Sequence, residues 1–153
     1  MTVHRALFSG LHSTINNTMN KHQIQNYIRV RDRLTAWGFT SEEIDKLFRV
    51  ERTLSRWSEL ECNGNIQRDE GTDLPRYYYE LRNGEFVRGK SVIPDREKGA
   101  LARLAKLMSA HPDYGAYNQG DPRGCALYIY PIKALEGRPI GSYYTSVGVA
   151  ICV

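Results

Sequence analysis

Cysteine is scarce in this sequence: Cys62, Cys125 and Cys152 are the only three among 153 residues. No two of them have the spacing of a zinc-binding pair, and an odd number of widely spaced thiols does not fit a disulfide framework. The scarcity therefore argues against a disulfide-stapled secreted scaffold and against a zinc module. We expect reduced thiols and a cytoplasmic location.

Long apolar runs are also missing. No segment approaches the roughly 20 apolar residues that a membrane-spanning helix needs, and residues 1–18 contain no apolar run of signal-peptide length. The sequence predicts no membrane association. Residues 1–20 precede the first helical periodicity, so we expect them to form a flexible arm.

The motifs of common catalytic and cofactor sites are absent as well. The chain has no phosphate-binding glycine loop and no Gly-x-Ser-x-Gly nucleophile elbow. Cys62 lies near acidic residues, as does Cys125, but no motif links either thiol to His111 as a base. We expect no cofactor, no metal and no enzymatic activity; the alternative is a cysteine-dependent enzyme.

Charge of one sign is not concentrated in either part of the chain. Residues 1–62 hold 9 Lys or Arg against 7 Asp or Glu, and residues 63–153 hold 12 against 10, so each part carries +2. A protein that neutralises phosphates usually clusters its cations. The net charge of +4 is therefore only weak evidence for a nucleic-acid partner.

What is present indicates one α+β domain over residues 21–153. A hydrophobic content of 41% is ordinary for a globular protein of this length. Apolar residues recur at helical spacing in 21–37, and Gly38 is suited to end that helix. Thr40 and Glu43 then form a capping-box pattern that starts a second helix, which predicts a helical hairpin over residues 21–62.

The second helix has two interpretations. It is either one continuous helix ending near Asn63-Gly64, or a helix-turn-helix with its corner at Arg49-Val50. The apolar series 47, 50, 54 and 57 runs without a phase break, and no Gly or Pro interrupts it, which favours one helix. In the alternative the outer side chains would contact DNA; these are Arg49, Arg52, Ser55 and Arg56.

A solvated helix face is the commoner fate of such arginines. Glu59 lies three residues from Arg56, and Glu51 and Glu59 each lie four residues from Ser55, so local ion pairs could absorb part of the positive potential. Both roles remain open from the sequence.

Residues 76–153 predict an antiparallel sheet of about five strands packed on one helix. Asn83-Gly84 separates two β-rich runs, which is the strongest short hairpin signal. A helix is predicted to start at Pro94-Asp95 and to end before Pro112, and strands are expected around 116–119, 124–130 and 143–151.

Two further features suggest a partner-binding surface. Alternation in the strand after Gly124 places Tyr128 and Tyr130 on the face away from the core, where exposed tyrosines could anchor a partner. The turn before this strand holds Asp121 and Arg123 on a rigid Gly- and Pro-containing loop. Strand propensity and turn structure are the competing explanations.

Four segments carry a resemblance to known sequences: 54–62, 66–69, 93–100 and 117–129. Through them, most of residues 34–152 resembles a group of small uncharacterised proteins encoded by bacteriophages and prophages. The resemblance implies a setting inside a bacterial host and assigns no chemistry.

Two hypotheses follow. The first is a phage-type accessory protein that contacts DNA through its helical hairpin, with the sheet as support or as a homodimer interface. The second is a stoichiometric inhibitor of a host defence complex, of the anti-CRISPR type, which binds a host nucleoprotein through the tyrosine face or the 121–124 turn.

Overall fold

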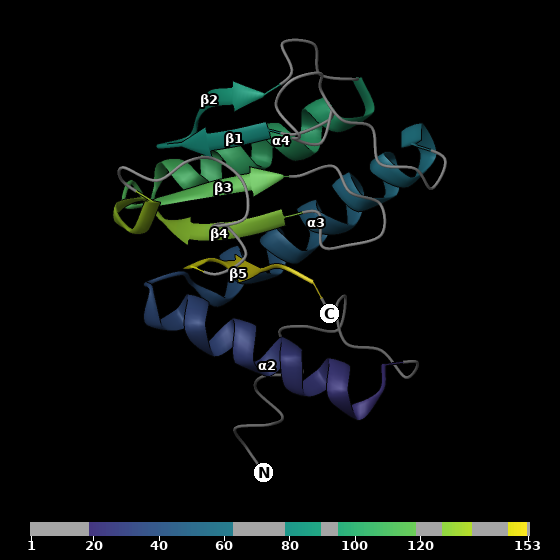
Figure 1. Cartoon of the computed structure of the whole chain (residues 1–153), viewed down its shortest axis with the longest axis vertical. Coiled ribbons are helices and arrows are strands. Elements are labelled where there is room, and N and C mark those ends of the chain that lie inside the picture. Colours follow the sequence, from purple (N-terminus) through teal and green to yellow (C-terminus); the bar gives the residue numbers. More distant parts are fainter. Residues whose placement is uncertain (1–18, 63–78, 90–94, 119–126, 136–146, 153) are drawn as a thin grey trace.

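A computed structural model describes residues 19–62, 79–89, 95–118, 127–135 and 147–152. These residues form an α+β fold in which two helices precede a five-stranded antiparallel sheet. A third helix lies between the second and third strands in chain order. Figure 1 shows the sheet in front, with its strands in the order β2-β1-β3-β4-β5. The elements are α2 (Lys21–Ala36), α3 (Ser41–Cys62), β1 (Tyr79–Arg82), β2 (Glu85–Gly89), α4 (Asp95–Ser109), β3 (Tyr114–Asn118), β4 (Leu127–Pro131), the 3-10 helix η1 (Ile132–Leu135) and β5 (Val149–Ala150).

The helices cover one face and one edge of the sheet. Helix α4 packs on β1 and β3, α3 packs against α4, and α2 lies along the edge strand β5 (Figure 1). The core between helices and sheet contains leucine and isoleucine from every layer, including Leu34, Leu47, Leu104 and Ile129, all fully buried. The predicted fold class is confirmed.

Helix α3 is continuous from Ser41 to Cys62. It passes through Arg49 and Val50 without a corner, so the helix-turn-helix alternative is wrong. The reason is the unbroken apolar stripe: Leu47, Val50 and Leu54 are all buried on one side, and a corner would move the later residues off that side.

The corner between α2 and α3 is fixed by the predicted cap. The Thr40 backbone N–H donates to Glu43 Oε1 at 2.8 Å, and the Glu43 N–H donates to Thr40 Oγ1 at 3.2 Å. Gly38 has φ +97°, as a left-handed helix end requires. Glu43 also contacts His111 Nε2 at 2.8 Å, and the His111 ring stacks on Phe39 at 3.9 Å. These contacts attach the corner to the segment between α4 and β3.

The electrostatics of Glu43 reflect this role. Burial acts to raise the pKa of Glu43, but hydrogen bonds from Thr40 and His111 outweigh it and leave the pKa below its ordinary value. The ionised carboxylate is thus the form that holds the corner.

We expect Thr40→Ala to lower the free energy of unfolding by about 1 kcal/mol, because it removes the hydroxyl that accepts from the Glu43 N–H. Thr40→Ser keeps that acceptor and should change stability by a few tenths of that amount. Urea unfolding of both variants measures the difference, and equal losses for Ala and Ser would contradict the cap's role.

The Asn-Gly hairpin is also confirmed. Asn83 and Gly84 have φ of +55° and +78° and join β1 to β2, whose strands pair from Arg82 and Glu85 outward. Both turn residues therefore adopt the left-handed conformation that an Asn-Gly turn supplies.

Candidate functional site: an arginine-lined groove

Helix α3 places its arginines on the side opposite the core. Arg49, Arg52 and Arg56 follow one another at three and four residues and are exposed, whereas Leu47 and Leu54 are fully buried. Residues at these spacings share one helix face, so the sequence alone aligns the three guanidinium groups along α3.

A groove of about 660 Å³ brings these side chains together. All four residues predicted to contact nucleic acid line it, and α4 contributes a further arginine, Arg103. The sequence could not indicate Arg103, because its position beside α3 follows from how the two helices pack. The lining residues are Arg49, Glu51, Arg52, Thr53, Ser55, Arg56 and Arg103.

The groove has an excess of positive charge. Its described lining residues carry four guanidinium groups and one carboxylate. Within the described residues, the ion pairs are Arg82 with Glu80 and His111 with Glu43, so none of the four groove arginines has a carboxylate partner there. Asp45 attracts Arg49 and Arg52 electrostatically, but no described carboxylate forms a salt bridge with a groove arginine.

Glu51 is the residue whose environment departs most from the sequence prediction. Surface ion pairs were one interpretation of this residue, but its side chain is buried, with 8% of the residue exposed. Phe48 and Leu54, which lie three positions before and after Glu51, are buried on the same face of α3. The sequence places position 51 on the apolar face of the helix, which indicates burial. An acidic residue at that position made the indication easy to miss.

Burial raises the pKa of Glu51 from 4.5 to about 7, and the nearby charge of Arg52 only partly opposes this. Among the described residues, no hydrogen bond to the Glu51 carboxylate is formed. A carboxyl group that lines a cationic groove is thus close to half protonated at neutral pH.

The chemistry of the lining suits phosphate oxygens. Guanidinium groups bind phosphate through two parallel N–H donors, and the hydroxyls of Thr53 and Ser55 add polar groups. The Thr53 hydroxyl already donates to the Arg49 carbonyl at 3.1 Å. No aromatic ring lines the groove in the described part of the chain, so the described lining residues offer no stacking surface for bases.

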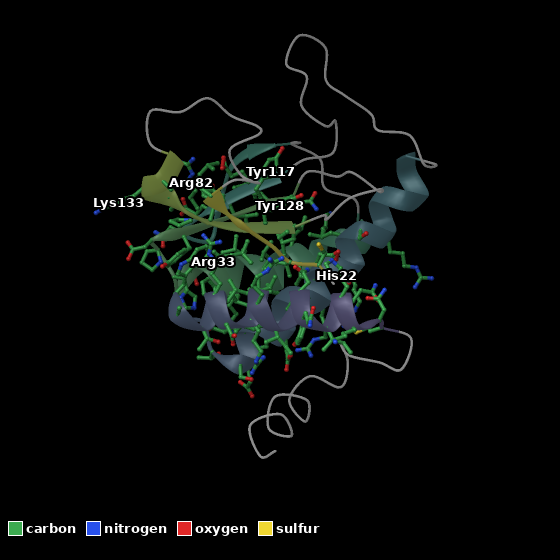
Figure 2. All side chains as sticks on the ribbon, turned by 60° about the horizontal axis from the view of Figure 1, so that its bottom comes forward. His22, Arg33, Arg82, Tyr117, Tyr128 and Lys133 are labelled. Atoms are coloured by element: carbon green, nitrogen blue, oxygen red, sulfur yellow. The ribbon has the colours of Figure 1, made fainter. Side chains whose placement is uncertain are left out.

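The predicted exposure of the sheet tyrosines is wrong. Tyr128 is 8% exposed and Tyr130 is fully buried, in a cluster with Tyr117 on the face of the sheet away from the helices. Figure 2 shows Tyr117, Tyr128 and Arg82 together on the side of the sheet away from α2. Alternation predicted the correct face but could not show that this face is covered.

A buried polar network accompanies these tyrosines. The Tyr130 hydroxyl donates to the fully buried Glu80 carboxylate and accepts from Arg82 Nε at 3.2 Å. Burial, followed by the hydrogen bond to Glu80, raises the pKa of Tyr130 above its ordinary value. The phenol therefore stays protonated and acts as an internal donor.

Most of the remaining candidates lie outside the residues that the structure describes. Asp121, Arg123 and Cys125 lie outside the described residues. His111 contacts Glu43 and Phe39. No group of three or more potential metal ligands occurs among the residues that the structure describes.

None of the described helices is long and apolar enough to cross a membrane. No protein family model, curated protein or solved structure matches this chain. The arginine-lined groove between α3 and α4 is accordingly the feature from which a function is inferred.

Proposed function

We propose that the protein binds the phosphate backbone of nucleic acid in the groove between α3 and α4. The observation that supports this proposal is the convergence of Arg49, Arg52, Arg56 and Arg103 on one groove. Arginines that serve only as the solvent-exposed face of a helix do not need to converge with an arginine from another helix.

The row of arginines along α3, formed by Arg49, Arg52 and Arg56, has a length that suits a polyanion. Arg49 and Arg56 are seven residues apart, which at about 1.5 Å per residue places them roughly 10 Å apart along α3. Phosphates along one strand of a duplex advance about 3.4 Å each along the helix axis. The row therefore matches a run of several phosphates, with Arg103 contributing from the side.

The mode of binding follows from what lines the groove. Phosphate contacts position a protein without selecting sequence, whereas selection needs contacts to base edges or stacking on aromatic rings. Guanidinium groups and hydroxyls are present, and aromatic rings are not among the described lining residues. The proposal is thus for sequence-independent binding without a recognition helix.

The inhibitor hypothesis receives less support. Its tyrosine anchors, Tyr128 and Tyr130, are buried. The resemblance to phage-encoded proteins is compatible with both hypotheses, so a bacterial host remains the proposed setting and a nucleoprotein complex a possible context for the nucleic acid.

The test is the affinity for a fluorescent oligonucleotide of random sequence, single-stranded and duplex, measured by anisotropy as salt is varied. With four phosphate contacts, log K should fall with log salt with a slope of about −3 to −4. Between about 50 and about 200 mM salt this is roughly a 100-fold loss of affinity.

Replacing Arg49, Arg52 and Arg56 together with Ala should reduce the magnitude of that slope by about 3. The matched control replaces Lys21, Arg29 and Lys133 with Ala; these are also exposed cations, but they lie outside the groove. Equal losses in the two triple variants would show that only net charge matters, and absence of binding at low salt would reject the proposal. Nuclease-treated affinity purification then distinguishes a nucleic-acid partner from a protein partner.

A further inference from the structure

Glu51 is an unexpected residue in an anion-binding groove. It lines the same groove as the four arginines, it is more than nine-tenths buried, and no described residue hydrogen-bonds to its carboxyl group. Glu51 is not among the described residues whose side-chain oxygen or nitrogen atoms are fully enclosed without a hydrogen-bond partner, so its carboxyl oxygens keep access to the groove that the residue lines. A ligand in the groove can therefore contact the Glu51 carboxyl group directly.

We propose that Glu51 is a binding residue that acts in its neutral form: its carboxyl O–H donates a hydrogen bond to a phosphate oxygen, so that binding takes up one proton from solution when the carboxylate begins ionised. This inference rests on the proposed function and specifies the protonation state of the same site. One O–H bond forms on Glu51 as the proton leaves water, and the phosphodiester keeps its charge.

The charges around Glu51 support the neutral form in the complex. The charged groups that line the groove with it are Arg49, Arg52 and Arg56 on its own helix and Arg103 on α4, and these favour a bound anion. An ionised Glu51 beside that anion would repel it. Protonation removes this repulsion and replaces it with a hydrogen bond.

The cost of that protonation is small near neutral pH. Burial has already raised the pKa of Glu51 to about 7, so a large fraction of the free protein carries the proton at that pH. An acid with an ordinary pKa would be almost fully ionised at neutral pH, so its protonation would cost much more free energy. Binding of an anion and binding of a proton are therefore linked, and each strengthens the other.

The expected result is an affinity that falls as pH rises. For an oligonucleotide whose phosphodiesters hold one charge each over this range, wild-type affinity should be roughly tenfold weaker at about pH 8 than at about pH 6, because the neutral fraction of Glu51 falls by about that factor. Glu51→Gln keeps the size and a donor N–H while removing the titration. Its affinity should match the wild-type value at the lower pH and stay level.

Calorimetry of the wild type and of Glu51→Gln in two buffers of different ionisation enthalpy supplies a second measurement. About one proton should be taken up per bound wild-type protein at about pH 8, and close to none at about pH 6. Groups common to both proteins contribute equally to wild type and Glu51→Gln and cancel in the comparison.

The outcomes separate the two proposals. Wild-type affinity that is level with pH, or a Glu51→Gln variant with the wild-type slope, would overturn the role of Glu51 while leaving phosphate binding in the groove intact. Failure of both proteins to bind at any pH would overturn the proposed function, and with it the role of Glu51. Level binding by Glu51→Gln together with proton uptake by the wild type supports the inference.

Discussion

Glu51→Gln is expected to stabilise the protein at about pH 8 by on the order of 3 kcal/mol relative to the wild type. The unfolded chain ionises Glu51 with a pKa near 4.5, whereas burial raises the folded-state pKa to about 7. The folded state therefore binds more protons than the unfolded state between these values. Stability from the neutral carboxyl is fully present below about pH 4.5 and is lost as pH rises through about 7.

The measurement is urea unfolding of both proteins at several pH values, without nucleic acid. Their difference in free energy of unfolding should be smallest at about pH 4.5 and should grow until about pH 7, then level off. Groups common to both proteins cancel from this difference. A difference that is constant with pH would show that Glu51 ionises as freely in the folded protein as in the unfolded chain.

Gly115→Ala is expected to destabilise the fold by about 3 kcal/mol. Gly115 on β3 lies directly opposite Tyr130 on β4, and a Cβ atom there would lie 2.5 Å from Tyr130 Cζ. The ring fills the space that a side chain would occupy. Displacing it costs packing and also weakens the hydrogen bond to the buried Glu80 carboxylate.

The control for this prediction is another glycine-to-alanine change in the same protein. Among the described residues, a Cβ on Gly99, in α4, would meet Arg103 Nη1 alone, at 3.5 Å, which is ordinary contact. Gly99→Ala should therefore stabilise the helix by about 0.5–1 kcal/mol. Thermal and urea unfolding should give opposite signs for the two variants, and a stable Gly115→Ala protein would show that the Tyr130 ring can move at little cost.

The local structure was largely predictable because short-range patterns determine it. The Thr40 and Glu43 cap, the positive φ of Gly38 and the Asn83-Gly84 turn each depend on a few neighbouring residues, and each occurs as predicted. Continuity of α3 followed from an apolar stripe without a breaker. The strands were predicted with shifted ends; β5 is described only over Val149–Ala150, while 143–146 lie outside the described residues.

The candidate site was only half predictable. Arg49, Arg52, Ser55 and Arg56 were identified from helical spacing, since one helix fixes their relative positions. The same spacing suggested that Glu51 sits at the surface in ion pairs, because a sequence gives the type of a side chain and not its solvent exposure. Tyr128 and Tyr130 were placed on the correct face of β4, but what covers that face is not a property of the strand.

By itself, the sequence determined which residues share a helix face, where helices and turns begin, and that three arginines form a row. Tertiary structure alone decided that Arg103 joins the row, that Glu51 is buried beside it, and that Gly115 receives the Tyr130 ring. The physical reason is range: helix and turn formation depend on residues within about four positions, whereas burial and its effect on a carboxyl pKa depend on which distant elements pack together.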